Sequence, residues 1–216
     1  MDNISYPTQM QVQSPDHYDR AQVVLRVLIA CGLGALQQRL GGMFGVLYFV
    51  LPALAAILIT QRSGRGYLER DGSWLSSALE WLMGLQAYML FVTDRFPLEP
   101  GTRPLRLTIE PRGEPSLADA LLRLLTSLPH AILLGLLSIP SFVASLIMAV
   151  TILIGGYVPS SLRGFQQGLL GWTARALAYH SSLVDAYPPF SLGLRDGQPP
   201  QAGPSGPAAA TSNSPA

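Results

Sequence analysis

Four long apolar stretches, separated by short polar segments, dominate the hydrophobic pattern of the chain. They cover residues 21–37, 40–60, 117–137 and 141–157. A helix of about 17–21 residues is about 25–31 Å long, which is enough to cross the hydrocarbon core of a bilayer. The breaks inside the two pairs, Gln38-Arg39 and Ser138-Ile139-Pro140, are short. We therefore expect four transmembrane helices arranged as two helical hairpins.

A second pattern occurs twice at the same spacing. Each copy has three aromatic residues on a seven-residue step, followed by Asp-x-aromatic-Pro, and the copies lie 91 residues apart. The members are Trp74, Trp81, Tyr88, Asp94 and Pro97 in the first copy, and Phe165, Trp172, Tyr179, Asp185 and Pro188 in the second. Matched spacing of this kind predicts an internal duplication, so that one structural unit is used twice.

The duplication divides the chain into a first unit (1–101), a second unit (102–194) and a tail (195–216). Each unit is expected to contain a short cytoplasmic strand, a transmembrane hairpin and an aromatic helix. The strands are expected at 10–12 and 107–109, and the aromatic helices at 73–93 and 162–184. The fold class is therefore an all-α integral membrane protein with two tandem hairpins, each followed by an amphipathic interfacial helix. The tail is rich in Pro, Ala, Gly and Ser and is predicted to be disordered.

Composition supports a membrane location and sets the orientation. Charged residues make up only 12% of the chain, about half the share usual in soluble proteins. All 14 basic residues are Arg, and only Arg39 lies in a hairpin loop. The positive-inside rule then places both hairpin loops outside, and both termini and the central segment in the cytoplasm. The net charge of +1 and the absence of a basic stripe argue against a nucleic-acid partner.

The aromatic stripes have two interpretations. Positions seven apart lie within about 20° of each other on a helix, so each set of three forms one stripe. The stripe could pack as a core seam against the hairpin, or it could anchor the helix in the headgroup layer, where Trp and Tyr are favoured. Polar residues in the second copy, among them Gln166, Arg175 and His180, favour the interfacial location. A six-span topology is the main alternative.

Asp94 and Asp185 stand at the ends of the aromatic helices, just before an aromatic-Pro step that favours extended backbone. A carboxylate at a helix C-terminus opposes the helix dipole, so each is expected to have a cationic partner. The candidate partners are Arg62 and Arg65 in the first unit and Arg163 in the second. Together with Pro97 and Pro188, the two carboxylates are predicted to form structural turns, with a catalytic role as the alternative.

Two arginines occupy equivalent places inside apolar helices. Arg26 and Arg123 each lie about two turns from the cytoplasmic end, so their side chains can snorkel and contact lipid phosphates. A transport role is the alternative. His130 lies deeper, after Pro129, and is expected to pack between helices, with proton relay as the other option.

Known catalytic motifs are absent from the sequence. It has no phosphate-binding loop, nucleophile elbow or zinc-protease motif, and its one cysteine, Cys31, lies in an apolar run. The N-terminus lacks the basic and apolar regions of a cleaved signal peptide. We therefore expect no enzymatic activity, no metal and no cofactor.

Two runs near the end of the second unit resemble a known family. These are Leu170-Gly171-Trp172-Thr173-Ala174-Arg175 and Asp185-Ala186-Tyr187-Pro188-Pro189-Phe190. They are similar to the end of an uncharacterised bacterial membrane family, domain of unknown function 4389. The resemblance covers about residues 5–195 as two units and implies the architecture described above, but it implies no activity. Ala186 departs from the family pattern, which has Arg at that place.

The sequence predicts a non-enzymatic inner-membrane protein that interacts with lipids or acts as a scaffold. Its expected partners are membrane lipids, with a second copy or another membrane protein as further options. The alternative function is a small transporter or lipid-translocating protein with a path along the pseudo-two-fold axis. A membrane enzyme ranks third, because the carboxylates do not cluster around a nucleophile.

Overall fold

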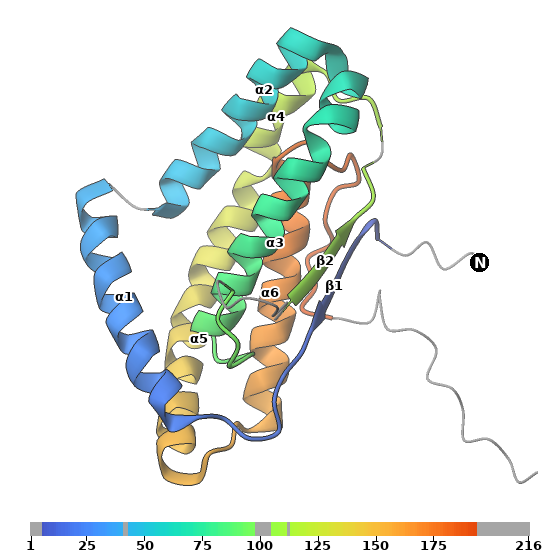
Figure 1. Cartoon of the computed structure of the whole chain (residues 1–216). Coiled ribbons are helices and arrows are strands. Elements are labelled where there is room, and N and C mark those ends of the chain that lie inside the picture. Colours follow the sequence, from blue (N-terminus) through green and yellow to red (C-terminus); the bar gives the residue numbers. More distant parts are fainter. Residues whose placement is uncertain (1–5, 41–42, 98–104, 112, 194–216) are drawn as a thin grey trace, which may run out of the picture.

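A computed structural model describes residues 6–40, 43–97, 105–111 and 113–193, and the predicted tail lies outside these residues. The described part is mostly helical (Figure 1). In chain order its elements are β1 (Thr8–Val12), α1 (Arg20–Leu40), α2 (Met43–Arg70), α3 (Gly72–Met89), β2 (Leu105–Ile109), α4 (Leu117–Thr126), α5 (Leu128–Gly155) and α6 (Ser160–His180).

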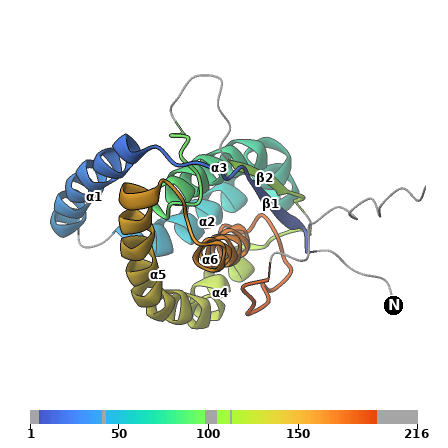
Figure 2. The same ribbon diagram turned by 90° about the horizontal axis from the view of Figure 1, so that it is seen from below.

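Helix α6 occupies the centre of the molecule. Seen along its axis, it is surrounded by α2, α3, α4 and α5 (Figure 2). Helices α3 and α6 are in contact, and buried apolar residues recur at every fourth position on both: Leu75, Leu79, Met83 and Ala87 on α3, and Leu170, Ala174 and Ala178 on α6. Residues spaced in this way form one ridge along a helix, and the small alanines allow close approach. The interface between these two helices is therefore tightly packed and apolar.

Strands β1 and β2 pair antiparallel, so both predicted strands are confirmed. In the register of the sheet, Met10 lies opposite Leu107. Side chains alternate between the two faces, because successive residues of a strand point in opposite directions. Leu105 and Leu107 face the core, whereas Gln11 and Arg106 are exposed on the outer face. The sheet thus covers the bundle with a polar outer surface.

The hairpin predicted in the second unit is not present. Helix α5 runs without interruption from Leu128 to Gly155, through the expected turn at Ser138–Pro140. Pro140 removes one backbone donor, which a long helix can tolerate, and the Ser138 hydroxyl donates to the Gly135 carbonyl at 2.6 Å. Among the described residues, one helical run is long and apolar enough to cross a membrane, namely Leu117–Gly155. The prediction of four transmembrane helices is therefore not supported. In the first unit, α1 extends over Gln38 and Arg39 to Leu40.

Helix α2 depends on a side chain of α6 to complete its hydrogen bonds. Pro52 lacks an N–H, so the Tyr48 carbonyl four residues earlier has no helical donor. The Nε2 atom of His180 lies 2.7 Å from this carbonyl oxygen and must donate to it, because a carbonyl can only accept. Burial lowers the pKa of His180, which favours the neutral ring. The Tyr48 ring also stacks on the imidazole.

This arrangement predicts a coupling between positions 52 and 180. His180→Leu should leave the Tyr48 carbonyl without a partner, which destabilises the protein by about 1–3 kcal/mol. In a Pro52→Ala background the new N–H at residue 52 can bond the same carbonyl, so His180→Leu should be less destabilising. Unfolding of the four variants in detergent measures the difference. An equal loss of stability in both backgrounds would show that His180 does not donate a hydrogen bond to this carbonyl.

Candidate functional site: two buried arginine–aspartate clasps

Two similar clusters close the ends of α3 and α6, and we call them the first and second clasp. The first clasp consists of Arg26 on α1 with Tyr88, Phe91, Thr93 and Asp94 at the end of α3. The second consists of Arg123 on α4 with Tyr179, Val184 and Asp185 at the end of α6. Each clasp therefore joins the first helix of a sequence unit to the last helix of the same unit.

The backbone at both helix ends has the same conformation. Phe91 and Ser182 have positive φ values of 58° and 62°, and the following residues bond back to the helix. The Val92 N–H donates to the Ala87 carbonyl at 3.0 Å, and the Leu183 N–H donates to the Ala178 carbonyl at 3.1 Å. With the bonds from Phe91 and Ser182 to Tyr88 and Tyr179, each end is a Schellman motif. This turn directs the next carbonyl and the Asp side chain toward the arginine.

The Schellman turn of α6 predicts a stabilising substitution. Glycine is the usual residue at its left-handed position, whereas Ser182 adopts this conformation with a buried hydroxyl that has no partner among the described residues. Ser182→Gly should raise the free energy of unfolding by about 0.5–1 kcal/mol, after allowing for the greater flexibility of glycine in the unfolded chain. Thermal unfolding in detergent measures this. The neighbouring control Ser181→Gly should destabilise the protein, because φ at Ser181 is −82°.

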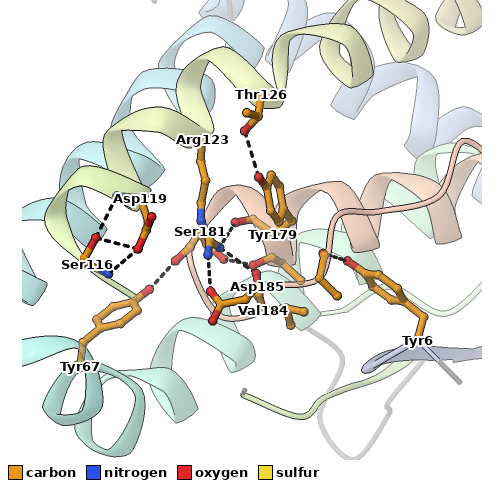
Figure 3. A network of polar contacts seen from close by, with 12 residues as sticks. Tyr6, Tyr67, Ser116, Asp119, Arg123, Thr126, Tyr179, Ser181, Val184 and Asp185 are labelled. Carbon is orange, nitrogen blue, oxygen red and sulfur yellow. Dashed lines mark hydrogen bonds and ion pairs between the residues drawn. The ribbon is translucent and has the colours of Figure 1, made fainter. Parts of the chain in front are cut away.

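In the second clasp, Arg123 binds three oxygens (Figure 3). Its Nη1 donates to the Tyr179 carbonyl at 2.6 Å and to the Val184 carbonyl at 2.7 Å, and its Nη2 pairs with Asp185. The guanidinium also lies 4.7 Å from the centre of the Tyr179 ring. A cation is favoured here because the carbonyls at a helix C-terminus carry partial negative charge.

The first clasp is built in the same way but is more enclosed. Arg26 Nη2 donates to the Thr93 carbonyl at 2.6 Å and to Asp94 at 2.7 Å. Its guanidinium lies 4.4 Å from the ring centres of both Tyr88 and Phe91, which favours cation–π attraction. Asp94 is 15% exposed, whereas Asp185 is 45% exposed. The ion pair of the first clasp is therefore the less solvated of the two.

Glycine is required beside the second clasp. Gly113 has φ +102°, and a Cβ added there would overlap the Asp185 carboxylate. Only a residue without a side chain allows the backbone before α4 to approach Asp185 so closely. The local sequence before α4 thus contributes to the position of the carboxylate.

The predicted role of the two arginines as lipid contacts is wrong for this structure. Arg26 and Arg123 are both buried, and their guanidinium groups face the helix ends described above. The predicted partners of the aspartates are also wrong. Arg62 pairs with Asp71, Arg65 pairs with Glu114, and Arg163 donates to the Val158 carbonyl at 3.2 Å. The signal that could have identified the true partners was the equivalent placement of Arg26 and Arg123 in the two units.

The aromatic stripes do not share one environment. Trp172, Tyr179 and Tyr88 are buried, so they are not headgroup anchors. Phe165 is half-buried. By contrast, Trp74 is 61% exposed and Trp81 is 45% exposed, and for these two residues lipid contact stays a prediction. The difference follows from the positions of the two helices, because α6 is central and α3 lies at the periphery.

Helices α5 and α6 are joined by polar side chains whose pairing the sequence did not reveal. The Trp172 indole N–H donates to Nδ1 of His130 at 3.0 Å. Further along the same interface, Gln166 bonds to the Ser141 hydroxyl, the Ser141 carbonyl and the Ser145 hydroxyl. Hydrogen bonds between apolar helices fix their relative position. His130 is thus placed as a helix-packing residue.

The chemistry of the clasps is that of structural contacts. Each carboxylate is paired with an arginine, and each arginine also binds backbone carbonyls. Asp94 and Asp185 are therefore held in turns, close to Pro97 and Pro188 in the chain. No group of three potential metal-ligating side chains occurs within the described ranges.

Comparison with known proteins identifies part of the chain. Residues 118–191 match the model of a family described as Domain of unknown function (DUF4389). This segment of the chain is similar to that family. The family domain covers nearly all of α4, α5, α6 and the second clasp. The match includes one unit, so the tandem arrangement of two family units stays a prediction. No curated protein and no solved structure matches the chain.

Proposed function

We propose that the chain is a non-enzymatic membrane protein that contacts lipid acyl chains through one flank and serves as a lipid-interacting scaffold. The observation that carries this proposal is the distribution of side chains around α5. Its buried stripe includes the polar residues His130 and Ser141, together with Ala144, Met148 and Ile152. Its exposed surface is apolar apart from Ser138.

The exposed surface of α5 is too apolar for contact with water alone. It is formed by Ile132, Leu133, Leu136, Ile139, Phe142, Val143, Leu146, Ile147, Val150, Leu153 and Ile154. Amphipathic helices of soluble proteins have the reverse arrangement, with apolar residues inside and polar residues outside. A helix with polar groups inward and aliphatic side chains outward is suited to a hydrocarbon solvent.

Neighbouring helices extend this apolar flank. On α1 the exposed apolar residues are Val24, Leu25, Val27 and Leu28. On α4 they are Leu117, Leu121, Leu122 and Leu125. Exposed apolar patches on soluble monomers rarely exceed a few hundred Å², and larger ones mark interaction surfaces. The polar face of the sheet lies on the other side of α6 from α5 (Figure 2), which supports a molecule with one lipid-facing flank.

The predicted internal duplication agrees with an architectural role for the clasps. Arg26 and Arg123 bind the ends of α3 and α6 through equivalent carbonyls and carboxylates. Met10 and Leu107, the predicted equivalent strand positions, lie opposite each other in the sheet, as expected for two units related by a two-fold axis. We infer that each clasp fixes the last helix of a unit against its first helix.

The transporter alternative has less support. A path along the pseudo-axis requires polar residues between the units, whereas α3 and α6 are in contact and contribute Leu79, Met83, Leu170 and Ala174 to one apolar core cluster. A bacterial inner membrane stays the proposed location, whereas the prediction of two cytoplasmic termini rested on a hairpin turn that the continuous α5 does not contain. A second copy or another membrane protein remains the proposed protein partner of a scaffold.

Membrane extraction tests the proposal. The full-length protein should remain in the membrane pellet after washing with high salt and with alkaline carbonate, because its attachment depends on apolar contact. Detergent should release it as a folded protein with lipid attached. Release by salt or carbonate as a folded, lipid-free protein would contradict the proposal.

A further inference from the structure

We propose that His130 is a proton-sensitive latch that holds residues 187–190 against α5 and α6. These residues follow the second clasp and cross the end of α5 that begins at Leu128. The proposal does not depend on the lipid-facing flank.

The imidazole of His130 is enclosed by aromatic side chains. It is 1% exposed, and it stacks on Phe190 with ring centres 4.2 Å apart and an interplanar angle of 11°. The Tyr187 ring lies 4.9 Å away, and the Trp172 ring lies 6.0 Å away at a nearly perpendicular angle. Phe190 and Tyr187 are themselves about half-exposed, so they form the outer layer of this cluster.

The hydrogen bond from Trp172 defines the protonation state of His130 in this cluster. An indole N–H can only donate, so Nδ1 of His130 must be unprotonated and the neutral ring carries its hydrogen on Nε2. Nε2 is also buried and has no hydrogen-bond partner among the described residues. The closed cluster is therefore specific for the neutral imidazole.

Protonation of His130 would disrupt this cluster. A hydrogen on Nδ1 would face the indole N–H and remove the hydrogen bond, and the new charge would be buried with no hydrogen-bond acceptor for either ring N–H among the described residues. Displacement of Phe190 and Tyr187 would give the cation access to water. The titratable or charged groups on the surrounding segments are Tyr179, Tyr187, Asp185, Arg123 and Arg175, and Asp185 is already paired with Arg123.

The rest of the C-terminal segment has separate attachments, so the movement would be local. Asp185 is held by Arg123, the Tyr6 hydroxyl donates to the Ala186 carbonyl at 2.8 Å, and Arg175 donates to the Ser191 carbonyl at 2.6 Å. These contacts lie on both sides of residues 187–190. Acid should therefore release a short loop and leave α6 and the second clasp in place.

Fluorescence of Trp172 tests the latch in the full-length protein. Trp74→Phe and Trp81→Phe leave Trp172 as the single tryptophan. We expect Trp172 to lose its protection from acrylamide quenching when the pH falls from about 8 to about 5, the range in which histidine titrates. His130→Gln should abolish this response, because glutamine can accept the indole hydrogen bond but does not titrate. His180→Gln should leave the response unchanged.

A second variant distinguishes the latch from general unfolding. With Phe190→Ala, Trp172 should be accessible at neutral pH and should show no further change in acid, while the helical circular dichroism is retained. The proposal is overturned if the acid response persists in His130→Gln, if it is lost in His180→Gln, or if the parent protein shows no response.

Discussion

Arg26→Leu is expected to destabilise the protein by about 3–5 kcal/mol, because it leaves a largely buried carboxylate without its cation. Asp94 is only 15% exposed, and the Thr93 carbonyl would lose its donor at the same time. The stacking of the guanidinium on Tyr88 and Phe91 would also be lost. Arg123→Leu should have a smaller effect, because Asp185 is 45% exposed and can be solvated.

A double-mutant cycle separates the ion pair from the packing of the arginine. Asp94→Leu removes the unpaired charge, so Arg26→Leu/Asp94→Leu should be more stable than the sum of the single losses predicts. Unfolding of the purified protein in detergent gives the four free energies. Strictly additive losses would mean that the ion pair does not link α1 to the end of α3.

Leu146→Asp is expected to reduce membrane insertion strongly. Leu146 is exposed on α5, within the surface proposed to contact lipid. A carboxylate near the centre of a membrane helix costs about 2.5–3.5 kcal/mol on insertion scales, which corresponds to a loss of about a hundredfold in the insertion equilibrium. The fraction of protein in carbonate-washed membranes measures the effect.

The matched control is Gln11→Asp on the outer face of the sheet, where the same charge should be tolerated. A water-exposed α5 gives the opposite result. In that case Leu146→Asp would raise the yield of soluble protein, because it would replace an exposed apolar side chain with a charged one.

Local patterns predicted the elements that depend on local interactions. The alternating segments around Met10 and Leu107 form the two strands, and the aromatic repeat lies on α3 and α6. The aspartates were correctly assigned a cationic partner, because a carboxylate at a helix C-terminus requires one. The partner itself depends on which helix packs against that end, and the equivalent placement of Arg26 and Arg123 in the two units was the sequence signal for it.

The predicted hairpin turn failed for a different reason. Serine and proline are common where helices end, which is why a turn was predicted at Ser138 and Pro140. A proline removes only one backbone hydrogen bond, however, and α5 continues past it. The aromatic anchors failed because a stripe of Trp and Tyr has the same spacing whether it faces lipid or protein. Trp172 is buried because α6 lies inside the bundle, whereas Trp81 is exposed because α3 lies outside.

Cysteine labelling at position 138 tests most directly whether α5 is one continuous lipid-facing helix. In a Cys31→Ala background, Ser138→Cys would place the single thiol near the middle of α5. We predict that a membrane-impermeant maleimide will not label it from either side of intact or opened vesicles, and will label it after denaturation in detergent. Thr108→Cys, on the outer face of the sheet, should label in opened vesicles. Rapid labelling of Cys at position 138 in native membranes would contradict a continuous α5 and would favour a hairpin turn at this point.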